Sequence, residues 1–297
     1  MPELPEVETV RARLAPVLTG RRFARVEIRD ARLTRPFDPQ AVASALEGEQ
    51  VRAVIRRGKY LVVGFESGRS LLIHLRMTGS IRHVPPGTSA DDPYGRAVVR
   101  LDDGSDVVYR DVRRFGTWLV VEPDELGPYL DARLGGEPLA RTFTPRRLAE
   151  RLRHRRAPIK AALLDQRTLA GMGNIYVDEA LWRAGIHPLR PANELEPEEV
   201  TRLTRAVKDA LRAGIARQGA TLRDYSTPDG RRGRMQETFR VYGRTGEPCG
   251  RCGTPIEKTR VAGRGTWYCP SCQQRGAAYA ARRSSSRPSR SRRQSSV

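Results

Sequence analysis

Four cysteines gather in one short segment near the end of the chain. They form two pairs, Cys249-x2-Cys252 and Cys269-x2-Cys272, with sixteen residues between the pairs. Two such pairs supply four thiolates at the spacing that closes a tetrahedral site, the usual arrangement of structural Zn²⁺. A redox pair or iron ligation is the alternative use of these thiols. With all four positions taken by sulfur, one zinc ion has no place for a catalytic water, so we expect it to fold a hairpin and to do no chemistry.

The amino terminus offers a nucleophile. Met1 precedes the small residue Pro2, and we expect its removal, which leaves Pro2 with a free secondary amine beside the carboxylates of Glu3 and Glu6. An amino-terminal amine has a pKa of about 7.7–8.0, so an unprotonated fraction is present at neutral pH. Such an amine attacks an aldehydic carbon to form an iminium while a neighbouring acid moves the protons. A plain helix amino terminus is the alternative.

Lysine is rare among the basic residues of this sequence. Of 54 basic residues four are lysines, at positions 59, 160, 208 and 258. Lys59 stands where a β-type run begins, and Lys160 follows Pro158 at the start of a predicted helix. A retained lysine indicates a place that favours a compact ammonium over the planar guanidinium of arginine. A solvated lysine in a turn is the alternative for both positions.

Two further groups of residues have a composition suited to nucleic acid. The segment 171–174, Gly-Met-Gly-Asn, separates two helical stretches, and we predict Asn174 as the N-cap of the second. Its glycines would let donors approach a phosphate closely, and an ordinary helix cap after a flexible turn is the alternative. Met77, Arg113 and Phe115 are by default core or strand-end residues. On turns, however, an apolar side chain with an arginine partner can wedge into a stack of bases.

The spacing of apolar residues predicts the elements that position these groups. Residues 2–18 carry apolar side chains at steps of three and four, which predicts one amphipathic helix. Short β-type runs between about 23 and 120 predict antiparallel sheets in two layers, with strands at 51–55, 60–65, 71–75, 97–101 and 118–121. Helices follow at 144–154, 158–165, 174–185 and 196–217. The predicted fold class is therefore α+β.

Turn signals and composition divide the chain into four parts. The sequence Leu-Gly-Gly-Glu-Pro at 134–138 predicts a boundary near 135. We expect a β-sandwich domain at 1–135, a helical domain with a loop at 219–234 in residues 136–235, and a zinc hairpin at 236–275. The tail 276–297 is rich in arginine and serine, has no acidic residue and cannot bury a core, so we predict that it is disordered.

The overall composition indicates the class of binding partner and the cellular compartment. The formal net charge is +20 and the isoelectric point is about 10.9, which favours a polyanionic partner, most simply nucleic acid. No apolar run approaches the ~18–20 residues of a membrane span, and the acidic start lacks the pattern of a signal peptide. The clustered cysteines suit a reducing compartment. We expect a cytoplasmic protein, and a monomer.

Four unrelated motifs in the correct order resemble the bacterial formamidopyrimidine-DNA glycosylases. They are Pro-Glu-Leu-Pro-Glu-Val-Glu at 2–8, Lys59, the segment 171–174, and Arg-Gly-Thr-Trp-Tyr-Cys-Pro-Ser-Cys-Gln at 264–273. The match covers residues 2 to about 275. The resemblance implies a bifunctional base-excision enzyme, a DNA glycosylase with abasic-site lyase activity. It also implies an amino-terminal β-sandwich flanked by helices, a helix-two-turn-helix domain and a four-cysteine zinc finger, with damaged double-stranded DNA bound between them.

The resemblance also implies a role for each matching residue. Pro2 is the nucleophile that attacks C1′ of the damaged nucleotide, Glu3 is the general acid and base, and Glu6 supports the site. A stacked duplex hides C1′, so the nucleotide must be extruded and the gap filled. The phosphate-gripping positions of the family match Lys59, His74, Asn174 and Arg264. The position near the flipped base matches Lys160. The residues that fill the gap match Met77, Arg113 and Phe115.

The lesion class rests on the same resemblance. Leu4 between Glu3 and Pro5, together with the gap-filling trio, looks like the branch that removes 8-oxoguanine and formamidopyrimidines, and the segment 219–225 resembles the loop that closes over 8-oxoguanine. The endonuclease VIII branch, which acts on oxidised pyrimidines, is the first alternative. A zinc-finger lesion-binding protein without catalysis is the second, and a basic RNA-associated protein is the third. The tail 276–297 extends beyond the family pattern, and we expect it to add nonspecific DNA affinity.

Overall fold

The computed structural model describes residues 2–275. The predicted removal of Met1 and the predicted disorder of the tail 276–297 lie outside these residues. None of the helices within residues 2–275 combines the length and the apolar character that a membrane crossing requires.

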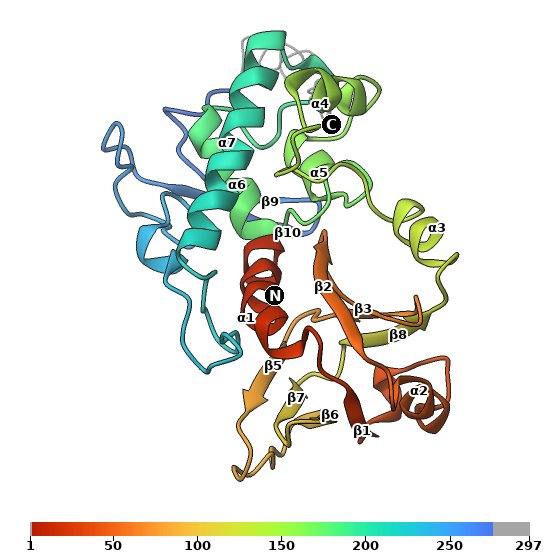
Figure 1. Cartoon of the computed structure of the whole chain (residues 1–297). Coiled ribbons are helices and arrows are strands. Elements are labelled where there is room, and N and C mark those ends of the chain that lie inside the picture. Colours follow the sequence, from red (N-terminus) through yellow and green to blue (C-terminus); the bar gives the residue numbers. More distant parts are fainter. Residues whose placement is uncertain (1, 276–297) are drawn as a thin grey trace, which may run out of the picture.

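The amino-terminal half is a sandwich of two four-stranded antiparallel sheets. One sheet has the order β1-β6-β7-β5 and the other the order β2-β3-β4-β8 (Figure 1). Apolar side chains of both sheets meet in one core, which places the connections between strands at the rim. The strands are β1 (Phe23–Ile28), β2 (Val51–Arg57), β3 (Tyr60–Phe65), β4 (Ser70–His74), β5 (Gly79–Val84), β6 (Gly95–Leu101), β7 (Asp106–Asp111) and β8 (Thr117–Val121).

Helix α1 (Leu4–Leu18) joins the sandwich to the helical half of the molecule. It has a proline in its first turn. The Glu3 N–H has no backbone acceptor in the helix and donates to the side chain of Glu6, at 2.8 Å from Oε2. Leu4 packs into the helical core, whereas Val7, Val10 and the later apolar residues pack into the sandwich core. Figure 1 shows α1 standing between the two halves. The first residues of the chain are therefore fixed by both cores.

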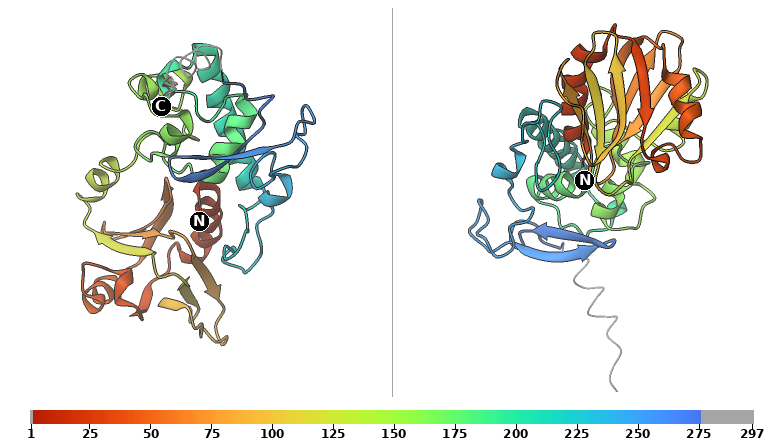
Figure 2. Two further views of the ribbon diagram at one scale, coloured as in Figure 1. Left: turned by 180° about the vertical axis from the view of Figure 1, so that it is seen from behind. Right: turned by 90° about the horizontal axis from the view of Figure 1, so that it is seen from below.

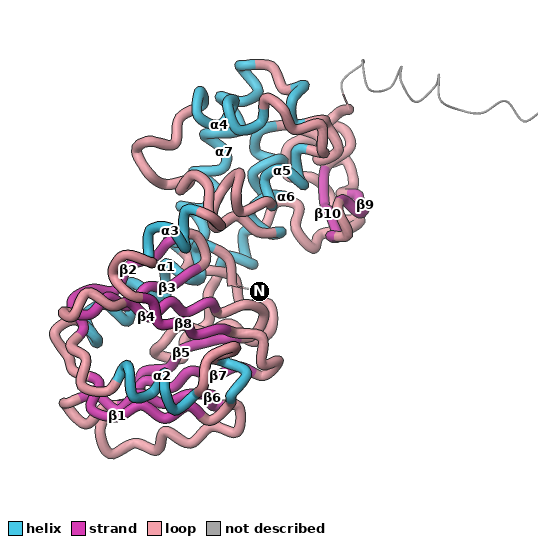
Figure 3. Tube along the Cα trace, turned by 90° about the vertical axis from the view of Figure 1, so that its right-hand side faces the viewer, coloured by secondary structure: helices cyan, strands magenta, loops and turns pink. Residues whose placement is uncertain are grey.

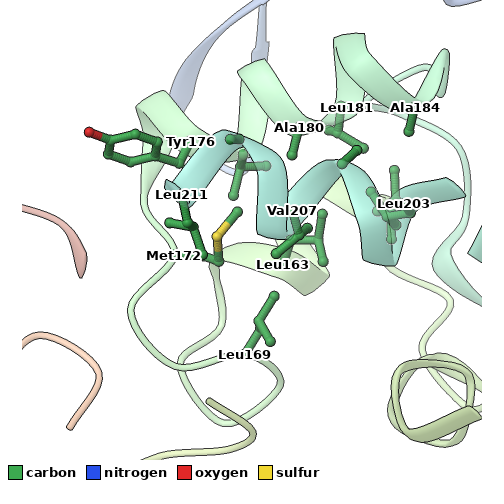
Figure 4. Packing of buried hydrophobic residues seen from close by; sticks show 14 of the residues in the cluster. Leu163, Leu169, Met172, Tyr176, Ala180, Leu181, Ala184, Leu203, Val207 and Leu211 are labelled. Carbon is green, nitrogen blue, oxygen red and sulfur yellow. The ribbon is translucent and has the colours of Figure 1, made fainter. Parts of the chain in front are cut away.

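The carboxyl-terminal half is helical. Its elements are α3 (Leu126–Asp131), α4 (Pro145–Leu152), α5 (Ile159–Leu164), α6 (Asn174–Ala184) and α7 (Pro197–Ala216). Helices α6 and α7 pack along each other through buried residues such as Leu181, Leu203 and Val207 (Figure 4). Tyr176 lies at the edge of this cluster with its hydroxyl directed away from it. Figure 3 shows the strands of the sandwich and the helices α4 to α7 as two separate lobes.

The hairpin of β9 (Glu257–Val261) and β10 (Arg264–Tyr268) follows the helices. Its two-residue turn contains Ala262 and Gly263, both with positive φ, 48° and 73°, which suits the right-handed twist of the strands. Strand β10 packs against α6. The view from below in Figure 2 shows helices between this hairpin and the sandwich.

The α+β fold class is confirmed, with a sandwich, a helical region and a cysteine hairpin in the predicted order. The five predicted strands and the four predicted helices after residue 144 are all present, with ends shifted by a few residues. Strands β1, β5 and β7 were not singled out, and two helices, α2 (Pro39–Leu46) and α3, were missed. One cap prediction is wrong: Gly173, not Asn174, is the N-cap of α6, because the Asn174 side chain is bonded elsewhere.

Candidate active site and DNA interface

Glu3 lies at the amino terminus of α6. Its Oε1 accepts a hydrogen bond from the Ile175 N–H at 3.0 Å, and its Oε2 accepts one from the Tyr176 N–H at 3.4 Å. A carboxylate is stabilised there because these N–H groups have no partner within the helix. The approach is possible because Gly173 has no side chain: a Cβ there would lie 2.2 Å from Cδ of Glu3.

Two other glycines make room for the amino-terminal residues. A Cβ on Gly171 would lie 2.7 Å from Cβ of Leu4, and one on Gly219 would lie 2.7 Å from Cγ of Glu6. The Leu4 N–H also donates to Gly171 O at 3.0 Å. The sequence predicted that the glycines of the segment 171–174 let donors approach a phosphate. In the structure Gly171 and Gly173 leave room for Leu4 and Glu3 at the start of α1. The N–H groups of α6 beside them donate to the Glu3 carboxylate.

Glu6 joins three segments of the chain. Its Oε2 accepts from the Glu3 N–H, and its Oε1 accepts from the Tyr176 hydroxyl at 2.8 Å and from the Ala220 N–H at 2.7 Å. The Tyr176 hydroxyl is the one that points out of the helical core in Figure 4. Burial raises the pKa of Glu6, and the nearby charge of Glu3 raises it further. Glu6 thus links α1 to α6 and to the start of the loop 219–234, and its supporting role in the reaction stays a prediction.

Pro2 lines a cavity between the two halves of the molecule. The cavity has a volume of about 360 Å³. Its wall combines residues of the sandwich, of the helical half and of the loop 219–234: Pro2, Met77, Thr78, Arg113, Ile175, Ala220, Leu222, Arg223, Asp224, Tyr225 and Tyr242. The predicted nucleophile, two of the three gap-filling residues and the predicted lesion loop therefore share one cavity.

Lys59 is buried where the sandwich meets α1. Its side chain is 6% exposed. Burial lowers the pKa of Lys59; the charges of Glu3 and Glu6 act in the opposite direction, and Arg264 lowers it further. These interactions place the ammonium near both carboxylates and near the hairpin, although the three segments are far apart in the chain. This is the compact cation that the rarity of lysine predicted.

His74 ends strand β4 beside the same region. Its Nδ1 accepts a hydrogen bond from the Arg76 N–H at 3.0 Å, and its ring packs edge-on against Tyr60 at 4.8 Å. Burial lowers the pKa of His74 to about 3, with the positive charge of Arg76 as the next cause. The imidazole is therefore neutral at pH 7 with its proton on Nε2, which makes it a hydrogen-bond donor suited to a phosphate oxygen.

Three polar side chains of the helical half hold strand β10. Lys160 Nζ and Asn174 Nδ2 both donate to Gly265 O, at 2.9 Å and 3.0 Å. Lys160 also forms an ion pair of 2.8 Å with Asp178 Oδ1, and Asp178 Oδ2 accepts from the Trp267 N–H at 3.1 Å. The Lys160 side chain is fully buried. Among the described residues it contacts the hairpin and Asp178, and its place near a flipped base stays a prediction.

Arg264 is the first residue of β10 and follows the turn. Its side chain is exposed. The carbonyl oxygen of the next residue, Gly265, accepts hydrogen bonds from Lys160 and Asn174. A phosphate-binding arginine needs an accessible guanidinium on a fixed backbone. Arg264 meets both conditions, and its positive charge lowers the pKa of Lys59.

The predicted gap-filling residues lie on two connections at the rim of the sandwich. Met77 is half-buried on the β4–β5 connection, and Arg113 and Phe115 are exposed on the β7–β8 connection. The guanidinium of Arg113 lies 4.8 Å from the centroid of the Phe115 ring, and that ring is 52% exposed. These are turn positions, so the wedge interpretation fits the structure better than the core interpretation.

The four cysteine sulfurs lie within 4.8 Å of one another. Tetrahedral zinc with Zn–S bonds of ~2.3 Å requires sulfurs about 3.8 Å apart. The Cys249–Cys272 and Cys252–Cys269 sulfur pairs are 3.9 Å and 3.5 Å apart, close to that value. The Trp182 indole N–H donates to Cys249 Sγ at 3.4 Å, a contact that favours a thiolate. The donor set fits one structural Zn²⁺, as predicted from the spacing.

Sequence reasoning missed three residues that shape this region. Asp178 holds the hairpin, as described, and burial raises its pKa to about 7. Glu179 is buried and accepts hydrogen bonds from the backbone N–H groups of Arg240 and Val241, at 2.9 Å and 3.0 Å. Tyr242 lines the cavity. Two adjacent carboxylates inside an otherwise apolar helix were the available signal for the first two, because buried charges require partners.

Sequence models of known families match three parts of the chain. They are the formamidopyrimidine-DNA glycosylase N-terminal domain at 1–118, the formamidopyrimidine-DNA glycosylase H2TH domain at 134–226, and a zinc finger found in FPG and IleRS at 246–275. A formamidopyrimidine-DNA glycosylase of Roseiflexus sp. (strain RS-1) is 46% identical over 275 residues, covering 92% of this chain and 100% of the relative. The chain belongs to the formamidopyrimidine-DNA glycosylase family.

Other relatives agree with this family membership. The formamidopyrimidine-DNA glycosylase of Geobacillus kaustophilus is 46% identical, with 92% of this chain and all of the relative covered. Two solved structures superpose on 92% of this chain and 100% of their own. One is the Lactococcus lactis Fpg bound to DNA with an abasic site, with a TM-score of 0.86 and 37% identity. The other is MutM bound to DNA with carbocyclic 8-oxo-G, with a TM-score of 0.85 and 38% identity.

Proposed function

We propose that this protein removes oxidised purines from DNA in base excision repair and cleaves the strand at the resulting abasic site, with Pro2 as the nucleophile. The observation that carries the proposal is the position of Pro2, in the wall of the cavity and next in sequence to Glu3, whose carboxylate is fixed at the α6 amino terminus. Membership of the family supports the reaction class. A cytoplasmic location in a bacterium fits the origin of the relatives.

The residues around Pro2 suit an iminium mechanism. Once Met1 is removed, the unprotonated amine attacks C1′, the bond from C1′ to the base breaks, and the departing base takes up a proton. The Glu3 carboxyl protonates the ring oxygen O4′, which opens the sugar and leaves an iminium between Pro2 and C1′. Loss of a proton from C2′ then expels the 3′ phosphate, and a second elimination expels the 5′ phosphate. Hydrolysis of the iminium frees the enzyme.

Cations and donors around the cavity supply the grip on the DNA backbone. We assign phosphate contacts to Lys59, His74, Asn174 and Arg264. His74 ends strand β4, Asn174 begins helix α6 and Arg264 begins strand β10. A DNA strand that contacts all of these residues is therefore held against both halves of the protein. Phosphate contacts of this kind position the duplex without reading its sequence, and they make binding strongly dependent on salt.

The lesion class follows from Leu4, the gap-filling trio and the loop 219–234, which support the oxidised-purine branch. One observation keeps oxidised pyrimidines as a second substrate class: a solved structure of wild-type Lactococcus lactis Fpg, 37% identical, holds DNA with an oxidised pyrimidine. A lesion panel separates the two. We expect single-turnover release of 8-oxoguanine opposite cytosine to be faster than release of oxidised thymine. The reverse order would move the protein to the endonuclease VIII branch, and binding without release would make it a lesion-binding protein.

The cysteine site holds one structural Zn²⁺ in this proposal. Cys249, Cys252, Cys269 and Cys272 would ligate it, and the metal would fix the loops that begin and end the hairpin. Because the hairpin carries Arg264, zinc contributes to DNA binding through structure and takes no part in the bond-breaking steps.

A further inference from the structure

A buried hydrogen-bond network joins the two connections that carry the gap-filling residues. Thr78, next to Met77, donates from its hydroxyl to Asp111 Oδ1 at 2.5 Å. The same hydroxyl accepts from the backbone N–H of Arg113 at 2.9 Å. The other oxygen of Asp111 accepts from the Gly116 N–H at 2.7 Å. Thr78 of the β4–β5 connection is therefore bonded directly to the start of the β7–β8 connection, and Asp111 bonds the end of that connection at Gly116.

The network is built into the sandwich and is largely buried, with Thr78 at the wall of the cavity. The side chains of Asp111 and Thr78 are buried, with exposures of 1% and 6%. Asp111 is the last residue of β7 and pairs with Gly79 of β5, so both strands end at the network. A buried carboxylate that accepts two hydrogen bonds is costly to disturb, since either donor would otherwise be left unpaired.

The backbone of each connection contains a residue in an unusual conformation. Arg76 and Arg114 have φ values of 51° and 59°, which side chains other than glycine rarely adopt. Such conformations persist only where the surrounding structure determines them. Arg76 also donates from its N–H to His74 Nδ1, and Arg114 pairs with Asp30. The hydrogen bonds of Thr78 and Asp111 are the contacts that join the two connections to each other.

The ends of the connections are fixed while their tips are exposed. Phe115 is half-exposed and stacks on Arg113, and Met77 and Arg113 line the cavity. A wedge that is ordered before it meets DNA loses little conformational freedom on insertion. Two connections that moved independently would have to be ordered separately when the lesion is extruded.

We propose that Thr78 and Asp111 are positioning residues that couple the two connections, so that Met77 and the Arg113–Phe115 pair enter the base stack as one unit. This inference rests on the proposed function, because it concerns how the same site extrudes a nucleotide. It assigns no bond-breaking role to either residue. The coupling acts on the step before chemistry, in which the lesion leaves the helix and the gap is filled.

Two Thr78 variants, a control and one further variant test the coupling. Thr78→Val keeps the shape of the side chain and removes the hydroxyl, whereas Thr78→Ser keeps the hydroxyl. Thr117→Val is the matched control, because Thr117 follows the same connection and its side chain forms no hydrogen bond with the rest of residues 2–275. Asp111→Asn is the second route if Thr78→Val does not fold, as judged by its melting temperature.

The readout compares two duplexes under single-turnover conditions. One carries 8-oxoguanine opposite cytosine, and the other carries the same lesion opposite a one-nucleotide gap, where the stack is already broken and no base remains for Arg113 to face. We expect Thr78→Val to slow excision about tenfold on the intact duplex and less than about twofold on the gapped one. A 2-aminopurine base beside the lesion should report slower unstacking in the same variant, with Thr78→Ser and Thr117→Val close to wild type.

Two results would overturn the coupling. One is an equal loss on both duplexes, which would assign Thr78 to chemistry or to general stability. The other is a Thr78→Val rate equal to that of wild type on the intact duplex. Failure of the proposed function is distinguishable from both, because wild-type protein would then excise 8-oxoguanine from neither duplex.

Discussion

Glu3 and Glu6 lie one helical turn apart, and their surroundings give them different tasks. Glu3 is bonded to the α6 amino terminus and is next to Pro2, so it can exchange protons with a substrate in the cavity. Glu6 is surrounded by protein donors from three segments, and burial raises its pKa. The partners of these two identical side chains therefore suit Glu3 to the proposed acid–base role and Glu6 to a structural link.

Substitution of Gly173 tests whether excision depends on the position of the Glu3 carboxylate. Alanine at this position would place its Cβ 2.2 Å from Cδ of Glu3, so the carboxylate must leave the α6 amino terminus. We expect Gly173→Ala to reduce single-turnover excision by about 100-fold, since a displacement of about 1 Å has that effect on positioned groups. Gly127→Ala is the control, because a Cβ there meets no atom within 4 Å. Equal rates for both variants would show that the Glu3 position is unimportant.

The buried imidazole of His74 makes stability depend on pH. Burial lowers the pKa of His74 from 6.5 to about 3, so between these values the unfolded chain binds a proton that the folded protein does not. The contribution of His74 to stability is therefore full above pH 6.5 and is lost as pH falls towards 3, by up to about 1.4 kcal/mol per pH unit. Urea unfolding at pH 5.5 and 7 should show a smaller difference for His74→Gln than for wild type. An unchanged difference would contradict the assignment.

At the scale of elements, the hairpin β9–β10 depends on helices α5 and α6 for its position. Lys160 and Asn174 share one acceptor in β10, and Asp178 accepts from the same strand two residues later. The ion pair between Lys160 and Asp178 is fully buried. The backbone on each side of Gly265 is thus fixed by the helical half, which sets the distance between Arg264 and the cavity.

Removal of one partner of this ion pair should be more harmful than removal of both charges. Lys160→Met leaves the Asp178 carboxylate buried without a cation, which costs about 3–5 kcal/mol. The double variant Lys160→Met with Asp178→Asn keeps an acceptor for the Trp267 N–H and removes the unpaired charge. We expect urea unfolding to show that the double variant recovers most of the stability, while DNA affinity stays low in both. Additive losses in the double variant would argue against a coupled pair.

Periodicity predicted the elements that bury one regular face, and local polar chemistry determined the rest. The apolar steps of residues 2–18 and 196–217 indicated α1 and α7. Helix α2 was missed although Asp38 caps it and Pro39 starts it, because it is short and stands among strands. The cap of α6 was wrong because Asn174 bonds to a strand ninety-one residues away, a contact that no local pattern contains.

The candidate site divides in the same way. The cysteine spacing predicted the zinc ligands without any structural information, and family resemblance supplied Pro2, Glu3 and the phosphate contacts. The carboxylates Asp178 and Glu179 could not be interpreted from sequence, because their partners are a lysine in another helix and backbone N–H groups of a distant loop. Sequence likewise does not show that the Lys160 ammonium has a buried partner in Asp178, and its position near a flipped base stays a prediction.

At the scale of the whole molecule, two cores share one helix and enclose one cavity. Leu4 belongs to the helical core and Val7 to the sandwich core, so the amino terminus is fixed where the halves meet. The loop 219–234 also reaches the sandwich, with the His83 N–H donating to Pro228 O at 3.1 Å. A substrate in the cavity therefore contacts both halves. The domain limits at 135, 235 and 275 stay a prediction.

The charge of the whole chain predicts how strongly DNA binding depends on salt. The net charge is +20, and removal of residues 276–297 with their six arginines lowers it to +14. We expect truncation after residue 275 to weaken nonspecific DNA binding and to reduce the slope of log K against log salt, by about 0.9 for each lost phosphate contact. Fluorescence anisotropy between 50 and 200 mM salt, with full-length protein as reference, measures this. An unchanged slope would show that the tail adds no phosphate contact.

Borohydride trapping tests the central claim most directly, because reduction turns an iminium into a stable bond. Purified protein is mixed with a duplex carrying 8-oxoguanine opposite cytosine and reduced, and the product is analysed by intact mass and by mapping of the amino-terminal peptide. A protein that retains one extra residue before Pro2 is the matched control. Our account predicts a crosslink at Pro2 of a chain without Met1, and none in the control. A crosslink at a lysine, or tight binding without any crosslink, would contradict the assignment of Pro2 as the nucleophile.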